Sequence, residues 1–177
     1  MKVPSQPILL VLFGALLGAG CGGDDPAARD EKLPACIVDI DKTITDGNYQ
    51  RHTSHKVPLP AATDVLRRIE EGGITVFYLS GRYASKLPRT VAWLEKHGFP
   101  TAGRVIHMQP EQGDIPDYKL REIRKIQERY EILCGFGNDS DLPVYRQADI
   151  HPICREMWRN EDWAEVSDNL DRLGKCE

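Results

Sequence analysis

The 177-residue sequence has no excess of positive charge, no Cys-x-x-Cys pair and no internal repeat. A formal net charge of −4 gives no electrostatic footprint for a nucleic acid, so we do not expect that partner. The missing cysteine pairs argue against a structural zinc site. The length allows one ordinary domain with a self-sufficient core.

The N-terminal region has the layout of a secretory signal. Lys2 supplies a positive region, and the uncharged apolar stretch Ile8–Gly20 ends in small residues before Cys21. That stretch is too short to favour a membrane-spanning helix. The next residues combine glycine, proline and charge without an apolar period. The expected segments are a signal peptide (1–20), a flexible tether (21–34) and a folded domain (35–177).

The stretch "GAGC" that ends at Cys21 also resembles the lipobox of bacterial lipoproteins, although Gly18 stands where leucine is usual. The resemblance implies cleavage before Cys21, acylation of its thiol, and a domain exported to the bacterial cell envelope and anchored to a membrane. The alternative is an ordinary secretory signal in which Cys21 is incidental.

Four further cysteines, if exported, meet an oxidising compartment. Four cysteines allow three pairings. Cys36 with Cys134 would join two neighbouring strands, and Cys154 with Cys176 would tie the last helix to the last strand. Buried free thiols are the competing interpretation.

Apolar runs and helical periods alternate along the domain, which predicts a mainly parallel five-stranded sheet with helices on both faces. In such an α/β fold the ligand lies outside the carboxyl ends of the strands. The expected strands are 35–40, 74–81, 104–108, 131–137 and 150–154. The expected helices are 60–73, 87–98, 117–130, 141–148 and 160–174. In helix 87–98 the expected buried line is Leu87, Val91 and Leu94.

Asp39 and Asp41 stand one residue apart at the end of the first expected strand. Two unit charges about 4 Å apart repel by about 4 kcal/mol at an effective dielectric of 20, so something must offset the repulsion. Mg²⁺, with oxygen ligands and a substrate phosphate, is the usual solution. One carboxylate can then attack phosphorus while the other exchanges protons.

Other polar residues follow later strands. Ser80 with the amides of Gly81 and Arg82 can hold a phosphoryl oxygen, and Lys119 can neutralise charge on the transferring group. Taken singly, each has a plainer explanation, such as a helix cap or a solvated helix face. After the fourth strand come the possible oxygen ligands for the same cation, Asn138, Asp139 and Asp141.

Four ordered segments resemble the motifs of the haloacid dehalogenase (HAD) superfamily: Asp39–Thr43, Ser80, Lys119 and Gly137–Asp141. The resemblance implies a Rossmann-like three-layer fold and phosphatase chemistry through an aspartyl-phosphate with Mg²⁺. Carried onto this chain, it makes Asp39 the nucleophile and Asp41 the acid/base, whose carbonyl also binds the cation.

The same resemblance assigns phosphate binding and the remaining metal ligands. Ser80 and Lys119 hold the phosphate, and Thr43, Gly81 and Arg82 complete the substrate site. The metal ligands come from Asn138, Asp139 and Asp141, with Asp139 favoured.

Two closer resemblances compete within the superfamily. "DIDKTIT", "YLSGR" and "FGNDSD" are similar to the catalytic domain of lipins, the phosphatidate phosphatases, whereas "MQPEQGDIPDYK" with "LSGR" is similar to the 3′-phosphatase domain of polynucleotide kinases. Lys42 stands where the family usually has glycine, and "GNDSD" is one residue shorter than the lipin loop.

No segment is long enough for a cap domain, and uncapped members of the superfamily tend to accept bulky substrates. The sequence therefore predicts an exported, Mg²⁺-dependent phosphomonoesterase acting on a large substrate such as a phospholipid. The alternatives are a lipoprotein that binds phosphate or lipid without cleaving it, one whose aspartates hold a structural ion, and a nucleic-acid 3′-phosphatase.

Overall fold

The computed structural model describes residues 32–46, 56–101, 106–110, 113–150 and 163–168. The chain divides into two units, Met1–Glu31 and Lys32–Glu177, and every described residue belongs to the second. The predicted signal peptide, Cys21 and most of the predicted tether therefore lie outside the described residues. Within the described part, no helix is both long enough and apolar enough to cross a membrane.

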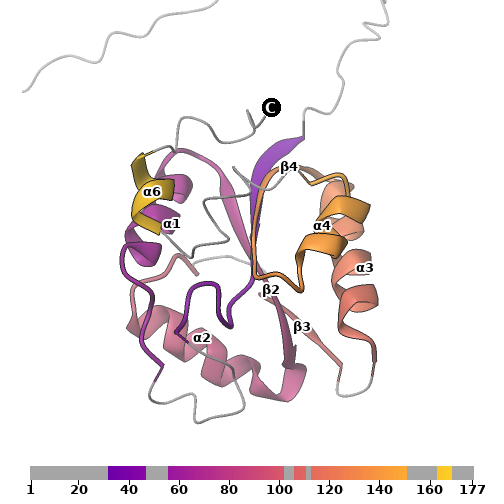
Figure 1. Cartoon of the computed structure of the whole chain (residues 1–177), viewed down its shortest axis with the longest axis horizontal. Helices are drawn as coiled ribbons and strands as arrows, with labels where there is room; N and C mark the ends of the chain where they lie inside the picture. The colour runs from indigo at the N-terminus through magenta and orange to yellow at the C-terminus, as the bar shows by residue number, and fades with distance from the viewer. Residues whose placement is uncertain (1–31, 47–55, 102–105, 111–112, 151–162, 169–177) are drawn as a thin grey trace, which may run out of the picture. The chain divides into compact units, whose positions relative to one another are not determined.

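Four parallel strands form the sheet, in the order β3-β2-β1-β4 (Figure 1). The strands are β1 (Leu33–Val38), β2 (Thr75–Tyr83), β3 (Ile106–Gln109) and β4 (Tyr130–Phe136). The parallel sheet is as predicted, although β1 begins within the segment that we assigned to the tether. The fifth expected strand, 150–154, lies outside the described residues except for Ile150, which is not in a strand.

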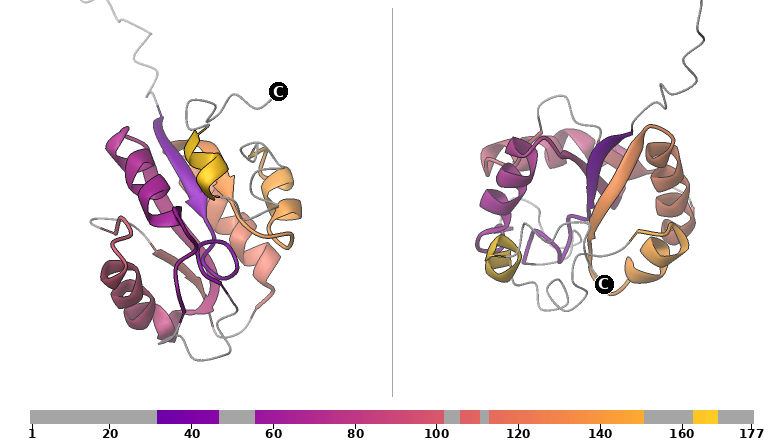
Figure 2. Two further views of the ribbon diagram at one scale, coloured as in Figure 1. Left: turned by 60° about the vertical axis from the view of Figure 1, so that its left-hand side comes forward. Right: turned by 90° about the horizontal axis from the view of Figure 1, so that it is seen from above.

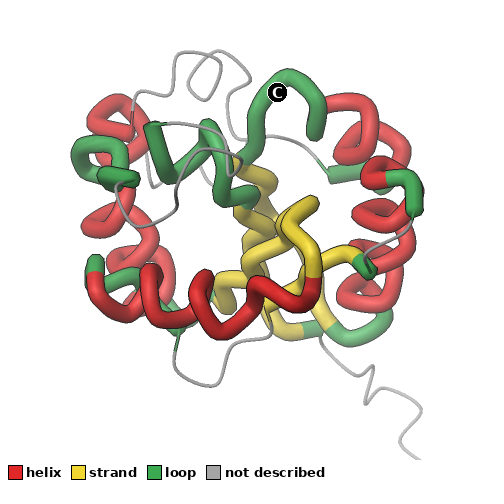
Figure 3. The backbone as a smooth tube through the Cα atoms, turned by 90° about the horizontal axis from the view of Figure 1, so that it is seen from below, coloured by secondary structure: helices red, strands yellow, loops and turns green. Residues whose placement is uncertain are grey.

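Helices cover both faces of the sheet, which makes three layers (Figures 2 and 3). Side chains of α1, α2 and α6 pack in one apolar cluster with the sheet, and side chains of α3 and α4 pack in the other. The helices are α1 (Ala62–Glu71), α2 (Leu87–Lys96), α3 (Ile115–Gln127), α4 (Leu142–Gln147) and α6 (Trp163–Asp168), with a short 3-10 turn, η2 (Ala84–Lys86), before α2.

The apolar run of β1 is continuous because both of its faces are covered. Cys36 and Val38 belong to the cluster under α1, whereas Ala35 and Ile37 belong to the cluster under α3. Successive side chains of a strand point to opposite faces, so a strand between two helical layers needs apolar residues at every position.

The buried face of α2 differs from the expected one. The structure buries Thr90, Trp93 and Leu94, while Leu87 and Val91 are only partly buried. The polar atoms of two of these residues have specific partners: Thr90 Oγ1 accepts from Arg82, and Trp93 Nε1 donates to the carbonyl of Lys56. The helix turns these groups inward, which the apolar period alone did not indicate.

A disulfide joins Cys36 of β1 to Cys134 of β4. The two residues are direct partners in the register of these neighbouring strands. The structure thus selects this pairing among the alternatives that the sequence left open. Cys154 and Cys176 lie outside the described residues.

The strand order places a topological switch between β1 and β4. The chain runs from β1 outward to β2 and β3, and then returns to the other side of β1 to form β4. At such a point the two connections leave in opposite directions and open a crevice at the carboxyl ends of the strands. Asp39 directly follows β1 at this end, and Gly137 directly follows β4.

Candidate active site

Asp39 is buried at the switch point, with 4% of its surface exposed. Its amide donates to the carbonyl of Phe136 at 2.8 Å, which continues the β1–β4 pairing into the site. Its Oδ1 accepts from Lys119 Nζ at 2.8 Å, and its Oδ2 accepts from Thr43 Oγ1 and Asn138 Nδ2, each at 3.2 Å. Side chains from its own turn, from α3 and from the loop after β4 therefore orient this carboxylate.

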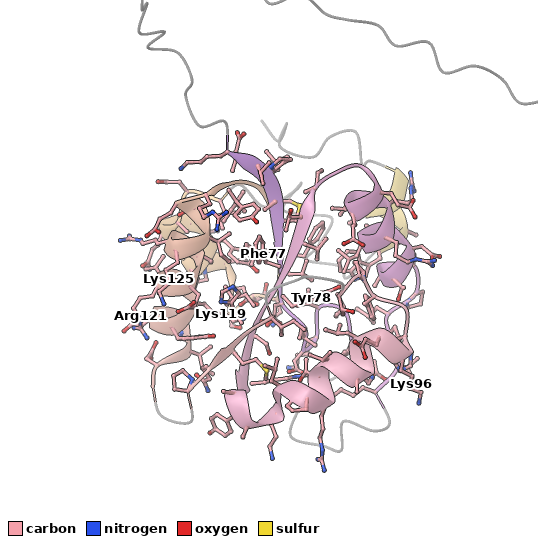
Figure 4. All side chains as sticks on the ribbon, turned by 180° about the vertical axis from the view of Figure 1, so that it is seen from behind. Phe77, Tyr78, Lys96, Lys119, Arg121 and Lys125 are labelled. Carbon is pink, nitrogen blue, oxygen red and sulfur yellow. A yellow bond between two sulfur atoms is a disulfide. The ribbon has the colours of Figure 1, made fainter. Side chains whose placement is uncertain are left out.

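Lys119 holds two buried carboxylates together. Its ammonium bonds to Asp39 Oδ1 and to Asp141 Oδ1, and both aspartates are at most 4% exposed. Burial raises the pKa of Asp39, and the attraction of Lys119 only partly opposes this shift. Burial alone would lower the pKa of Lys119, but Asp39 and Asp141 outweigh it and raise that pKa. Figure 4 shows Lys119 between α3 and the sheet, whereas Arg121 and Lys125 of the same helix lie on the outer side.

Asp41 has a different set of partners. Arg82 donates to it twice, from Nε to Oδ2 at 2.8 Å and from Nη2 to Oδ1 at 2.9 Å, and Lys56 Nζ bonds to Oδ1. Partial burial would raise the pKa of Asp41, but the hydrogen bonds and charges of Arg82 and Lys56 lower it. Asp41 is therefore held as a carboxylate.

Lys56 is a site residue that the sequence did not reveal. It lies in the loop before α1, only 7% exposed, and has no regular spacing to the aspartates. Its carbonyl accepts from Trp93 Nε1 at 3.1 Å, so α2 fixes the loop that carries it.

The charged groups around Asp39 and those around Asp41 thus differ in the sign of their net charge. On the β4 side, Asp39 and Asp141 share the single ammonium of Lys119, which leaves one negative charge in excess. On the β2 side, Asp41 faces both Arg82 and Lys56, so these three described groups together carry a net positive charge. The repulsion that we expected a divalent cation to offset is offset here by the protein's own cations. Such a site attracts a cation on one side and an anion on the other.

The loop after β4 contributes Asn138 and Asp141. The Asn138 Nδ2 atom lies 3.2 Å from Asp39 Oδ2 and 3.2 Å from the carbonyl oxygen of Asp41. Asp141 Oδ2 accepts a hydrogen bond from the backbone N–H of Asn138 at 3.0 Å. A side chain at position 137 would prevent this contact between Asn138 and Asp141, because its Cβ would lie 2.6 Å from the Cβ of Asp141.

Magnesium fits this half of the site. Asp39 Oδ2 and the carbonyl oxygen of Asp41 both lie within hydrogen-bonding distance of Asn138 Nδ2, so these two oxygens are close together. The Asp141 carboxylate binds Lys119, as Asp39 does. Among the described residues no group of three or more His, Cys, Asp or Glu side chains forms a metal cluster. Mg²⁺ does not require one, because it usually takes one or two carboxylates and completes its shell with water and phosphate.

Asp139, the favoured metal ligand in the sequence analysis, is exposed and has no hydrogen bond to the other site residues. Its buried neighbour Asp141 lies beside Lys119 instead. The structure thus brings Asn138 and Asp141, and not Asp139, into contact with the other site residues.

Ser80 and its neighbours lie at the end of β2. Ser80 is buried, and its Oγ accepts from the Arg82 amide at 3.2 Å, so this amide is engaged within the strand end. Gly81 faces Ile115 at the start of α3, and a Cβ at Gly81 would lie 3.1 Å from the Ile115 Cγ2 atom. The small residue lets the helix that carries Lys119 approach β2 closely.

The backbone at Lys42 suits the glycine that the sequence resemblance led us to expect at this position. Its φ of 61° is left-handed, a conformation that costs an L-residue with a side chain about 1–2 kcal/mol and costs glycine nothing. The chain turns sharply here, since the amides of Thr43 and Ile44 both donate to the Ile40 carbonyl.

A family model matches residues 36–154, and its description is the LNS2 domain of PITM 1-3. The chain belongs to the LNS2 domain family. This is a lipin-type, HAD-like domain, which confirms the resemblance inferred from the aspartate motifs.

Curated relatives match up to about two thirds of this chain. A segment of the membrane-associated phosphatidylinositol transfer protein 1 of Homo sapiens is 30% identical over 120 residues, which are 67% of this chain and 10% of that protein. The protein retinal degeneration B of Drosophila melanogaster is 28% identical over 116 residues, 64% of this chain and 9% of that protein. The chain thus spans about a tenth of the length of these relatives.

Solved structures share the fold. The class C acid phosphatase from Bacillus anthracis with tungstate bound has a TM-score of 0.55 at 21% identity, covering 82% of this chain and 65% of that one. The Pnkp1/Rnl/Hen1 RNA repair complex has a TM-score of 0.57 at 20% identity, covering 68% and 41%. The LNS2 domain therefore has the fold of the HAD phosphatases.

Proposed function

We propose that this LNS2 domain hydrolyses phosphomonoesters and that Asp39 is its nucleophile. The observation that carries the proposal is the position of Asp39: a buried carboxylate at the switch point, oriented by Lys119, Thr43 and Asn138. Preorganised donors of this kind stabilise the charge that develops on a transferring phosphoryl group.

The reaction would proceed in two displacements. A carboxylate oxygen of Asp39 attacks phosphorus, the bond from phosphorus to the ester oxygen breaks, and the leaving oxygen receives a proton from Asp41, which must first take up that proton from water. Water then attacks the aspartyl-phosphate, its proton passes to Asp41, and the bond between Asp39 and phosphorus breaks to release inorganic phosphate. Lys119 balances charge at the nucleophile, while Arg82 and Lys56 provide the positive half of the site.

Magnesium would be held by the Asp39 carboxylate, the Asp41 carbonyl, and Asn138 or Asp141. When bound, it supplies charge neutralisation at the phosphoryl oxygens. The excess negative charge on the β4 side supports this assignment, since a cation there lowers the repulsion between Asp39 and Asp141.

A phospholipid or another bulky phosphomonoester is the proposed substrate. The connection from β3 to α3 comprises only residues 110–114, which leaves no room there for a cap over the site. The relatives include membrane-associated phosphatidylinositol transfer proteins, which supports a lipid substrate. Export and an acyl anchor at Cys21 belong to the same proposal, because an anchor would keep the domain at a lipid surface.

The test is the Asp39→Asn variant assayed with an aryl phosphate and with phosphatidic acid in the presence of Mg²⁺. The amide is nearly isosteric but cannot form an aspartyl-phosphate, so turnover should fall by about 10⁴-fold or more while the fold is retained. Asp139→Asn is the matched control, since Asp139 is exposed, and it should retain activity within a few-fold. Substantial turnover by Asp39→Asn would reject the nucleophile assignment.

A second candidate function, phosphate or lipid binding without cleavage, is favoured by the surroundings of Asp41. A general acid must carry a proton when the leaving group departs, and Arg82 with Lys56 holds Asp41 as a carboxylate. If the domain only binds its ligand, the wild-type protein and the Asp39→Asn variant should bind phosphatidic acid vesicles equally well. Neither protein should release phosphate in the presence of Mg²⁺.

A further inference from the structure

Lys42 is exposed although it lies between two residues of the active site. The Thr43 hydroxyl donates to the Asp39 carboxylate, and Arg82 binds the Asp41 carboxylate. Lys42 itself takes part in no hydrogen bond or ion pair found among the described residues. Its long side chain therefore starts at the edge of the phosphate site and ends in solvent.

The backbone at Lys42 gives a reason to ask what this lysine does. Its φ of 61° is the left-handed conformation, which glycine adopts without strain and lysine does not. Residues held in such a conformation cluster at functional sites, where another benefit outweighs the strain. Among the described residues, the exposed Lys42 side chain forms no hydrogen bond or ion pair that would supply that benefit.

Charge supplies a candidate benefit. The buried cations of the site are bound to its carboxylates: Lys119 to Asp39 and Asp141, and Lys56 with Arg82 to Asp41. Their charges balance those of the three aspartates, so Lys42 adds one positive charge at the rim. The exposed acids of the flanking loops, Asp46 and Asp139, form no ion pair with it among the described residues.

We infer that Lys42 binds a second phosphate group lying beside the phosphate that Asp39 attacks. This inference rests on the proposed function and narrows its substrate class. The second phosphate can belong to the same molecule, as in a bisphosphate, or to the headgroup of a neighbouring anionic lipid. In either case the flexible ammonium reaches outward as a point charge.

The test measures binding, so that it does not depend on turnover. In the Asp39→Asn background with Mg²⁺, titration calorimetry compares 1,3-propanediol monophosphate with 1,3-propanediol bisphosphate. With Lys42 present, the bisphosphate should bind about tenfold more tightly, the effect of about 1.4 kcal/mol. With Lys42→Gly, which suits the backbone, the preference should fall to about twofold, the statistical value for two equivalent ends. Lys42→Arg should keep it.

A second arm uses phosphatidylcholine vesicles that contain phosphatidic acid, with or without phosphatidylserine, in a sedimentation assay. Dependence on Lys42 in the soluble arm identifies a bisphosphate, and dependence only when phosphatidylserine is present identifies a neighbouring lipid. Lys96→Gln is the control for loss of one exposed positive charge, because Lys96 is the last residue of α2 (labelled in Figure 4). This variant should preserve both binding preferences.

The outcomes separate this inference from the function on which it rests. Binding of the monophosphate with no dependence on Lys42 in either arm overturns the inference and leaves the phosphate site intact. Failure of every compound to bind overturns the phosphate site, and the inference with it.

Discussion

β1 has a neighbouring strand on each side, β4 and β2. Asp39 and Asp41, which follow β1, are held by different interactions on these two sides. Towards β4, the strands are joined by the Cys36–Cys134 disulfide, and the pairing continues into the site through the Asp39 amide. Towards β2, Arg82 binds Asp41 by two hydrogen bonds from a strand that has no covalent link to β1 among the described residues.

The difference is one of charge as well as of bonding. The β4 side has two buried carboxylates and one ammonium, whereas the β2 side has one carboxylate and two cations. Two aspartates that look equivalent in the sequence therefore have pKa values shifted in opposite directions, upward for Asp39 and downward for Asp41.

The largest expected effect is loss of the covalent link on the β4 side. The disulfide closes a segment with a sequence separation of 98, and a loop of about 100 residues is stabilised by about 4.7 kcal/mol on chain entropy. The Cys36→Ala/Cys134→Ala variant should lose about 4–5 kcal/mol in urea unfolding. A reductant should weaken wild type similarly and change the variant much less. Equal stability of variant and wild type would show that the link does not constrain the unfolded chain.

Removing the shared ammonium should come next. Lys119→Met leaves Asp39 and Asp141 buried without a cation, which costs about 3–5 kcal/mol in comparable buried pairs. Urea unfolding measures this loss. Lys125→Met, on the exposed side of the same helix, should cost less than about 0.5 kcal/mol. A mild effect of Lys119→Met would mean that the β4 side is less desolvated than the structure indicates.

The β2 side should be more tolerant. Arg82→Gln removes the charged donors of Asp41 but leaves Lys56, and the carboxylate is 20% exposed to water, so we expect a loss of about 2 kcal/mol. The exposed Arg121→Gln is the control and should change the unfolding free energy by less than about 0.5 kcal/mol. A loss as large as that of Lys119→Met would remove the asymmetry between the two sides.

Chelation should have the smallest effect on stability. A catalytic Mg²⁺ near its dissociation constant contributes about 0.4 kcal/mol, because binding stabilises by RT ln(1 + [L]/Kd). EDTA should therefore abolish phosphate release while Tm changes little. A large fall in Tm would instead favour a structural ion on the β4 side.

Much of the fold was predictable because burial on both faces leaves a strong local signal. β1, β2 and β4 are apolar runs, and the helical period of Val65, Leu66 and Ile69 matches the buried face of α1. The period was only partly right in α2: Leu94 is buried as expected, but Trp93 and Thr90 also face inward and bond with polar atoms from other segments.

The site was predictable where its residues stand at strand ends, as Asp39 and Ser80 do. Lys56 was not, because its contact with Asp41 depends on a loop that α2 holds through Trp93. The choice between Asp139 and Asp141 also had no local signal. It depends on how closely Asp141 packs against Gly137, and that distance is a property of the three-dimensional structure.

The order of strands and helices, the acids at the end of β1 and the family membership are properties of the sequence, because local hydrophobic pattern and motif spacing carry them. The tertiary structure alone decided which cations reach which acid. Lys119 and Asp141 are distant from Asp39 in the chain, as Lys56 and Arg82 are from Asp41, and only packing of the helices against the sheet brings them together. Electrostatic interaction depends on distance in space rather than on separation along the chain.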